Sequence, residues 1–485
     1  MGNGELKDKV AAGVAWSIAE KVGSMLLQMV VSIVVARLLM PEDFGVMAIM
    51  TSFTAIALVV VDSGFSQTLI RKENPTDEEY KSVFVFNIAM SVVLYAVLVA
   101  ISPLVASYYG QPVIARIAPV LFLLLPANAL CVIQNTIFTR QFRFGLLSKA
   151  TFASSLGADI VAIAMALAGC GVWSLVGQRL ATLVFKAAIL WFASDWRPSS
   201  ARLTAAPVKE MAPFSLRLLS TDIISTLYNN IAQMFIGKIY SADALGYFNQ
   251  AQKFKDLPVT STMQAVQSVT YPALSKIGGD ERKFTESYRQ VMMVVAFAMF
   301  PMMAGIIAVA DDLFLLLLGE KWLPTVPYLR ILCITGLFYP LAMIAYNILK
   351  VRSNGDIILK LEILKKIIMT AILAVTIPQS VEAVAWGLAA MSLCEFVVNF
   401  TASQRYTSLS LLRMVRTLLP TLLVTAAMYA AVMLVGRYVA GYGEALRLLV
   451  KIVTGVVVYV VLALAFRLEA AREIITVLRR MAGKR

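Results

Sequence analysis

Three charged side chains lie close together in a long apolar part of this chain. Lys253, Lys255 and Asp256 fall within the stretch 242–274, which is long enough to cross a bilayer as a helix. Charged groups in a membrane are costly, so two ammonium groups at mid-depth require a counter-ion, water or an anionic ligand. Asp256 can neutralise one of them. The remaining positive charge could hold a diphosphate or an acidic sugar through charge-assisted hydrogen bonds.

A plainer interpretation of the same three residues stays open. If the membrane-spanning part begins later, near Leu257, both lysines lie at the surface and extend their ammonium groups into water.

Polar residues with matching helical spacing occur twice, 201 residues apart. Steps of seven and four residues return to nearly the same face of a helix. The first set is Lys21, Gln28 and Ser32, and the second is Asp222, Asn229 and Gln233. Because polar side chains in a bilayer usually face a bundle interior or a wet cavity, we expect these stripes to line a central cavity. The alternative is that they form hydrogen bonds between packed helices.

Three further ionisable residues are weaker candidates, for gating or ion coupling. Asp62 lies near the cytoplasmic end of the second expected helix, where it forms either an inner gate or a simple surface contact. Asp159 and Arg179 lie ten residues on either side of the turn near Gly169. That spacing predicts an ion pair across a helical hairpin, which is either a structural clamp or, through Asp159, a proton or sodium coupling site.

The composition requires a membrane to surround these residues. Of 485 residues, 59% are hydrophobic and only 15% are charged, and the mean hydropathy is +0.78. A soluble protein of this size carries far more charge. The chain has no histidine, which excludes imidazole catalysis. Its four cysteines are far apart and show no metal-ligand spacing, so we expect no metal and no cofactor beyond a coupling cation, H+ or Na+.

The apolar runs predict about fourteen transmembrane helices in an all-α integral membrane protein. Basic residues crowd alternate loops, which places both termini in the cytoplasm. We expect a first six-helix lobe over 1–200, a second over 201–405, two extra helices over 406–467 and a cytoplasmic amphipathic tail over 468–485. Because each lobe enters from the same side, the pseudo-symmetry axis runs along the membrane normal. Asp311 and Asp312, at an outer helix end, are expected to be a solvated loop.

Short motifs support the repeat and carry a resemblance. The segment Ala36–Gly45, ARLLMPEDFG, echoes Gly237–Gly246 in the second half. Together with DSGF at 62–65 and GVWSLV at 171–176, it resembles the polysaccharide exporters of the multidrug/oligosaccharidyl-lipid/polysaccharide (MOP) flippase superfamily, in particular the Wzx-like group.

The resemblance implies a V-shaped fold of two lobes and alternating access. It also implies export of a glycan, linked to a polyprenyl diphosphate, from the cytoplasmic to the outer leaflet of a bacterial inner membrane, alongside polysaccharide assembly machinery. Two other functions stay open: a drug or cation exporter of the related multidrug and toxic-compound extrusion branch, and a glycan polymerase or ligase. The short, nearly uncharged outer loops and the lack of paired catalytic groups argue against an enzyme.

Overall fold

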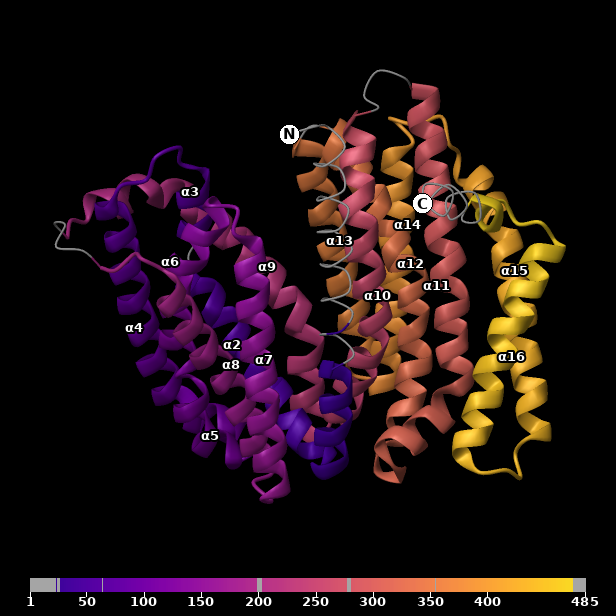
Figure 1. The fold of residues 1–485 in the computed structure, drawn as a ribbon, viewed down its shortest axis with the longest axis horizontal. Coiled ribbons are helices and arrows are strands. Elements are labelled where there is room, and N and C mark those ends of the chain that lie inside the picture. Colours follow the sequence, from indigo (N-terminus) through magenta and orange to yellow (C-terminus); the bar gives the residue numbers. More distant parts are fainter. Residues whose placement is uncertain are drawn as a thin grey trace, which may run out of the picture. The chain divides into compact units, whose positions relative to one another are not determined.

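The computed structural model describes residues 23, 27–62, 64–198, 203–276, 281–353 and 355–473. The regular secondary structure of this part of the chain is helical, without strands (Figure 1). Within these residues, ten helical segments are long and apolar enough to cross a membrane. The predicted all-helical membrane fold is therefore confirmed, while the total of fourteen spans stays a prediction.

The chain divides into two compact units, the first reaching Gly246 and the second starting at Tyr247. Packing therefore joins the helix expected to open the second lobe, α9 (Ala206–Ile239), to the first unit. The boundary between the two repeats near residue 200 was inferred from sequence similarity between the halves, and it stays a prediction.

The first unit is built around α2 and α6. Ala57 and Val61 of α2 are buried against Leu125 and Ala129 of α6. α7 and α8 form a tightly packed hairpin, and α9 packs against α2, α3 and α4. Besides α9, the elements of this unit are a helix over Leu27–Leu38, α2 (Pro41–Asp62), α3 (Phe65–Arg71), α4 (Asp77–Tyr109), α5 (Val113–Leu121), α6 (Leu124–Arg140), α7 (Phe144–Leu167) and α8 (Val172–Ala193).

Local sequence signals set the ends of these helices. Before α4, the Thr76 hydroxyl accepts from the Glu79 amide at 3.3 Å, and the Glu79 carboxylate accepts from the Thr76 amide at 2.8 Å. This capping box satisfies two backbone donors that the first turn leaves open. The α7–α8 turn uses Gly169 and Gly171, both at positive φ, which glycine adopts without steric cost.

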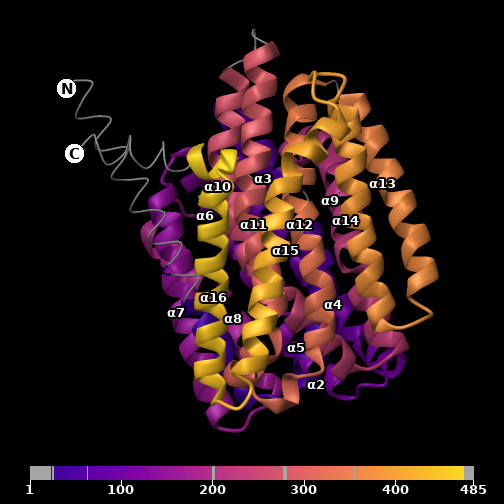
Figure 2. The ribbon, with the colours of Figure 1, turned by 90° about the vertical axis from the view of Figure 1, so that its right-hand side faces the viewer.

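α10 (Ala242–Lys276) begins in the first unit and continues in the second. In the second unit, α12 packs against α11 and α14, and the α15–α16 pair packs against α11 (Figure 2). The elements that follow α10 are α11 (Glu281–Leu318), η1 (Glu320–Trp322), α12 (Thr325–Arg352), α13 (Gly355–Thr376), α14 (Val381–Ser403), α15 (Leu411–Tyr438) and α16 (Glu444–Ala465).

α16 shows why a bilayer must surround this fold. It buries only a narrow stripe that includes Gly455, Tyr459 and Ala463. The rest of its surface is apolar and exposed, with a row formed by Leu449, Val453, Val456, Val457, Val460, Val461 and Leu464. A continuous exposed apolar face of this kind is stable in contact with lipid rather than water.

Candidate functional site

The two polar stripes have matching surroundings wherever both are described. Gln28 and its repeat-related partner Asn229 are exposed, whereas Ser32 and its partner Gln233 are half-buried. Asp222 is also half-buried, and its partner Lys21 lies outside the described residues. Equal exposure at equivalent positions supports a common role for the two stripes. A chamber lined by them stays a prediction.

Asp62, at the end of α2, lies near the second stripe. Its carboxylate interacts electrostatically with that of Asp222 on α9 and accepts a hydrogen bond from the Ser66 hydroxyl. Both acids were candidate residues in the sequence analysis, but the sequence did not predict that they interact with one another.

The charged group of α10 lies well inside a continuous helix. α10 begins at Ala242, so Lys253 is about 16 Å along its axis at 1.5 Å per residue. The Lys255 ammonium lies 2.5 Å from the Asp256 carboxylate, and the Lys255 side chain is only 13% exposed. Lys253 is exposed. Buried residues of α10 such as Phe254, whose ring centroid is 4.8 Å from that of Phe314, hold the helix in place.

In the α7–α8 hairpin, Asp159 accepts a hydrogen bond from the residue next to its expected partner. Its side chain is buried, and its Oδ1 atom accepts from the Gln178 amide at 2.7 Å. Arg179 is exposed. One residue corresponds to about 100° of rotation on a helix, which separates the Gln178 and Arg179 side chains. The hydrogen bond across the hairpin is made by Gln178, and an ion pair between Asp159 and Arg179 stays a prediction.

The two copies of the echoed motif contact one another in the first unit. A Cβ atom added to Gly45 would lie 1.7 Å from the carbonyl oxygen of Ala242, and one added to Gly246 would lie 2.0 Å from that of Pro41. In the sequence repeat, Pro41 corresponds to Ala242, and Gly45 to Gly246. The contact is therefore reciprocal. The starts of α2 and α10 cross so closely that only glycine fits at either position.

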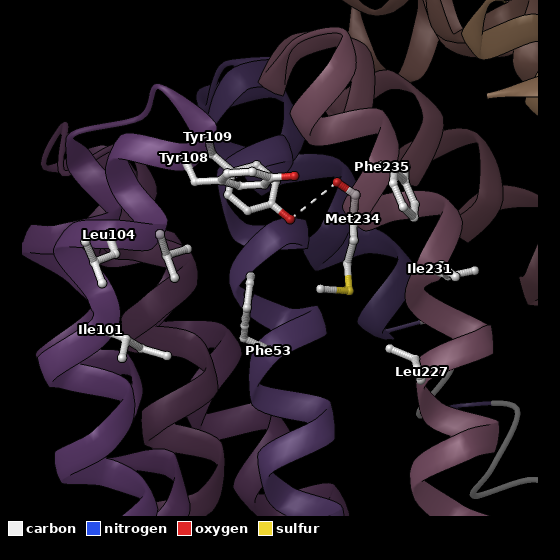
Figure 3. Close-up of a pocket in the computed structure, with 10 residues that line it drawn as sticks. Phe53, Ile101, Leu104, Tyr108, Tyr109, Leu227, Ile231, Met234 and Phe235 are labelled. Atoms are coloured by element: carbon white, nitrogen blue, oxygen red, sulfur yellow. Dashed lines mark hydrogen bonds between the residues drawn. The ribbon is translucent and has the colours of Figure 1, made fainter. Parts of the chain in front are cut away.

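An apolar pocket of about 460 Å³ opens beside α4 and α9 (Figure 3). The Tyr109 hydroxyl donates to the Met234 carbonyl at 3.3 Å, which links the two helices. The pocket is lined by Phe53, Ile101, Leu104, Val105, Tyr108, Tyr109, Leu227, Ile231, Met234 and Phe235. This lining suits a hydrocarbon chain rather than a sugar. Its residues come from three helices and are ordinary apolar types, so the sequence contained no signal for it.

One sequence expectation about charged residues is wrong. Asp312 was expected in a solvated loop, but it is buried at the outer part of α11, with 2% of its surface exposed. Its carboxylate pairs with Arg447 and, at 2.5 Å, with Lys451, both on α16. The neighbouring Asp311 is exposed and pairs with Arg330. Asp312 therefore anchors α16 to α11.

Comparison with known proteins connects this geometry to a family. Residues 34–327, more than half of the chain, match the family described as "Polysaccharide biosynthesis protein". The chain belongs to this family. The matched region runs from the first copy of the echoed motif through α9, α10 and the Asp312 anchor, so it includes most of the candidate residues. The predicted resemblance to the polysaccharide exporters is confirmed.

Individual relatives support the same assignment. The chain is 24% identical over 428 residues to the teichuronic acid biosynthesis protein TuaB of Bacillus subtilis (strain 168), which covers 87% of each chain. It is 24% identical over 333 residues to the succinoglycan biosynthesis transport protein ExoT of Rhizobium meliloti (strain 1021), covering 68% of this chain and 67% of the relative.

Among solved structures, the chain resembles the lipid II flippase MurJ in an inward closed conformation. The TM-score is 0.74 at 14% identity, and the match covers 95% of this chain and all of MurJ. At this identity the likeness concerns the fold. The protein is a multi-pass membrane protein of the flippase fold within the polysaccharide biosynthesis family.

Proposed function

We propose that this protein is a flippase that moves a lipid-linked oligosaccharide or polysaccharide from the cytoplasmic to the outer leaflet by alternating access. The observation that carries the proposal is the family match over residues 34–327, since it includes the second polar stripe, on α9, and the charged group of α10. ExoT is named a succinoglycan biosynthesis transport protein and TuaB a teichuronic acid biosynthesis protein.

We propose a substrate linked to a polyprenyl diphosphate. Lys253 and Lys255 lie about three turns inside α10, where Asp256 neutralises one of the two positive charges, and the remaining ammonium charge would bind diphosphate through charge-assisted hydrogen bonds. Asp222, Asn229 and Gln233 on α9 supply hydrogen-bond donors and acceptors suited to sugars. Lys21, Gln28, Ser32 and Asp256 complete the proposed lining.

The driving ion is part of the same proposal. Asp62, whose carboxylate interacts electrostatically with that of Asp222, is a candidate for gating or coupling. Asp159, as a possible proton or sodium site, and Arg179 are candidates of the same rank. No other cofactor is proposed, and the protein is proposed to transport its substrate without altering it.

The proposed arrangement has fourteen spans. Two pseudo-symmetric six-helix lobes are followed by α15 and α16, with both termini in the cytoplasm of a bacterium and the chain in its inner membrane. α9, α10 and α13 fall outside the ten most apolar spans, and charged residues within them explain this. Helices that line a wet cavity tolerate such residues. Polysaccharide assembly enzymes are the proposed partners.

The α10 lysines provide the test of the proposed site. Replacing Lys253 and Lys255 together with alanine should lower glycan export at least about tenfold at matched protein levels, since each charge-assisted hydrogen bond contributes roughly 1.5–3 kcal/mol. The Lys253→Arg/Lys255→Arg variant should retain most export. A matched control removes two exposed lysines elsewhere, Lys209→Ala/Lys360→Ala. Export equal to wild type in the alanine variant would remove these lysines from the substrate site.

A further inference from the structure

A polar cavity lies in the second unit. It has a volume of about 370 Å³ and is formed where the start of α15, the third and fourth turns of α11 and the segment after α16 meet. The lining includes four arginines and one carboxylate: Arg289, Arg413, Arg416 and Arg467, with Glu469. The sequence showed these arginines only as part of the general cytoplasmic excess of basic residues.

The charge of this arginine pocket is not balanced by the acids around it. Arg289 contacts both Glu286 and Glu469, each at 2.8 Å. Four arginines against these two carboxylates leave two positive charges in excess. Arg413, Arg416 and Arg467 are all exposed, so their guanidinium groups are accessible from the membrane surface. Guanidinium groups match the geometry of phosphate oxygens in bidentate pairs.

The backbone at Arg467 supports a role for its side chain. Arg467 has φ +50°, a left-handed conformation that costs a non-glycine residue free energy. It occupies the position after the C-cap of α16, where the Leu468 amide donates to Ala463 at 3.0 Å and the Arg467 amide to Leu464 at 3.1 Å. This Schellman motif normally has glycine at that position. An arginine held in a conformation that glycine would adopt more easily points to a function for the guanidinium group.

The rim of the pocket is apolar. Phe466 is 69% exposed and Leu412 is 62% exposed, and Val415 and Leu419 continue the exposed apolar face along α15. A ligand that fits both parts has an anionic head and hydrocarbon chains. Basic pockets between transmembrane helices near the membrane surface bind the head groups of anionic lipids.

We infer that the arginine pocket binds the phosphate head group of an anionic phospholipid, with the acyl chains along the exposed face of α15. The site lies within the second unit and does not depend on the proposed transport function. A bound lipid there bridges α11, α15 and the end of α16, and so stabilises the attachment of the two C-terminal helices.

The test uses the purified full chain in detergent, with lipid binding measured by native mass spectrometry. The probes are phosphatidylglycerol and phosphatidylcholine with identical acyl chains. Wild type should bind phosphatidylglycerol preferentially. Each arginine near an anionic head group contributes roughly 1 kcal/mol, so Arg413→Gln/Arg416→Gln should weaken this binding roughly thirtyfold and Arg467→Gly about fivefold. Arg282→Gln, which removes an exposed arginine at the start of α11, is the control and should bind as wild type.

Arg467→Gly separates loss of the ligand from loss of folding. Glycine suits φ +50°, so this variant should melt at or above the wild-type temperature while binding the lipid more weakly. Equal binding of the two lipids by wild type, or undiminished phosphatidylglycerol binding by the double variant, would overturn the inference. If inorganic phosphate displaced phosphatidylglycerol at the same concentration at which the lipid itself binds, the site would be a site for free anions. That result would overturn the lipid assignment.

Discussion

Asp311 and Asp312 are neighbours in the sequence with very different surroundings. Asp311 is 56% exposed and its partner Arg330 is 41% exposed, whereas the Asp312 side chain is 3% exposed between Arg447 and Lys451. Water screens the first pair strongly, and exposed pairs of this kind contribute about 0–1 kcal/mol. Removing one partner from a buried pair leaves uncompensated charge, at a cost of about 3–5 kcal/mol.

We therefore expect Asp312→Asn to destabilise the purified protein by about 3–5 kcal/mol, because two cations on α16 lose their shared carboxylate. Asp311→Asn, one residue away, should change the stability by no more than about 1 kcal/mol. Thermal unfolding in detergent measures both variants. Equal melting temperatures for the two would show that the Asp312 group does not anchor α16.

The Asp312 anchor also illustrates what residue-level reasoning can predict. Charge placement in the sequence identified Asp62, Asp159, Asp222 and Lys255 as residues inside helices, and the structure places each of them there. It identified Asp256 as a counter-ion for one of the two lysines of α10, and the structure pairs Asp256 with Lys255. It did not identify contacts between distant segments. Arg447 is 135 residues from Asp312, so only the fold brings them together. The hydrogen bond from Gln178 to Asp159 depends on a helix rotation that sequence spacing does not fix.

At the level of the elements, the main feature is the crossing of α2 and α10. Gly45 meets the Ala242 carbonyl and Gly246 meets the Pro41 carbonyl, so equivalent positions of the two repeats contact each other reciprocally. Close packing of α2 and α10 thus explains why both copies of the echoed motif contain a glycine at this position. A carbonyl is part of the backbone and cannot rotate away from an added methyl group.

We expect Gly45→Ala to force α2 and α10 apart and destabilise the protein by about 1–3 kcal/mol or more, as overpacking does elsewhere. Gly305→Ala on α11 is the matched control, since nothing lies within 4 Å of its added Cβ atom. That control should be neutral or slightly stabilising, because alanine favours helix. Melting temperatures and export activity would be compared at matched protein levels. A melting temperature equal to that of wild type in Gly45→Ala would contradict the close contact between α2 and α10.

The helices themselves were predictable because long apolar runs and capping residues are local signals. The turn at Gly169 and Gly171 appears where the sequence analysis expected it. Contacts between helices were less predictable. The repeat indicated two related halves but not that its two motifs touch, and nothing in the sequence indicated that α9 packs with the first unit. The apolar pocket beside α4 and the arginine pocket beside α15 likewise arise from helices distant in sequence.

At the scale of the whole molecule, family and fold agree. Residues 34–327 match the polysaccharide biosynthesis family, and the fold resembles that of MurJ over 95% of the chain. The proposed function adds a direction of movement, a diphosphate-linked substrate and a coupling ion. Of these, movement of the lipid-linked glycan across the bilayer is the central claim, since the roles of the α10 lysines and the polar stripes depend on it.

Reconstitution tests that claim most directly. The purified chain would be placed in vesicles that contain a polyprenyl-diphosphate-linked oligosaccharide on the inner leaflet only. A membrane-impermeant lectin added outside would then report how fast the glycan reaches the outer leaflet. The account predicts transfer that is fast with wild-type protein and at least about tenfold slower with Lys253→Ala/Lys255→Ala. Transfer at the same rate in vesicles without protein and in vesicles with wild type would contradict it.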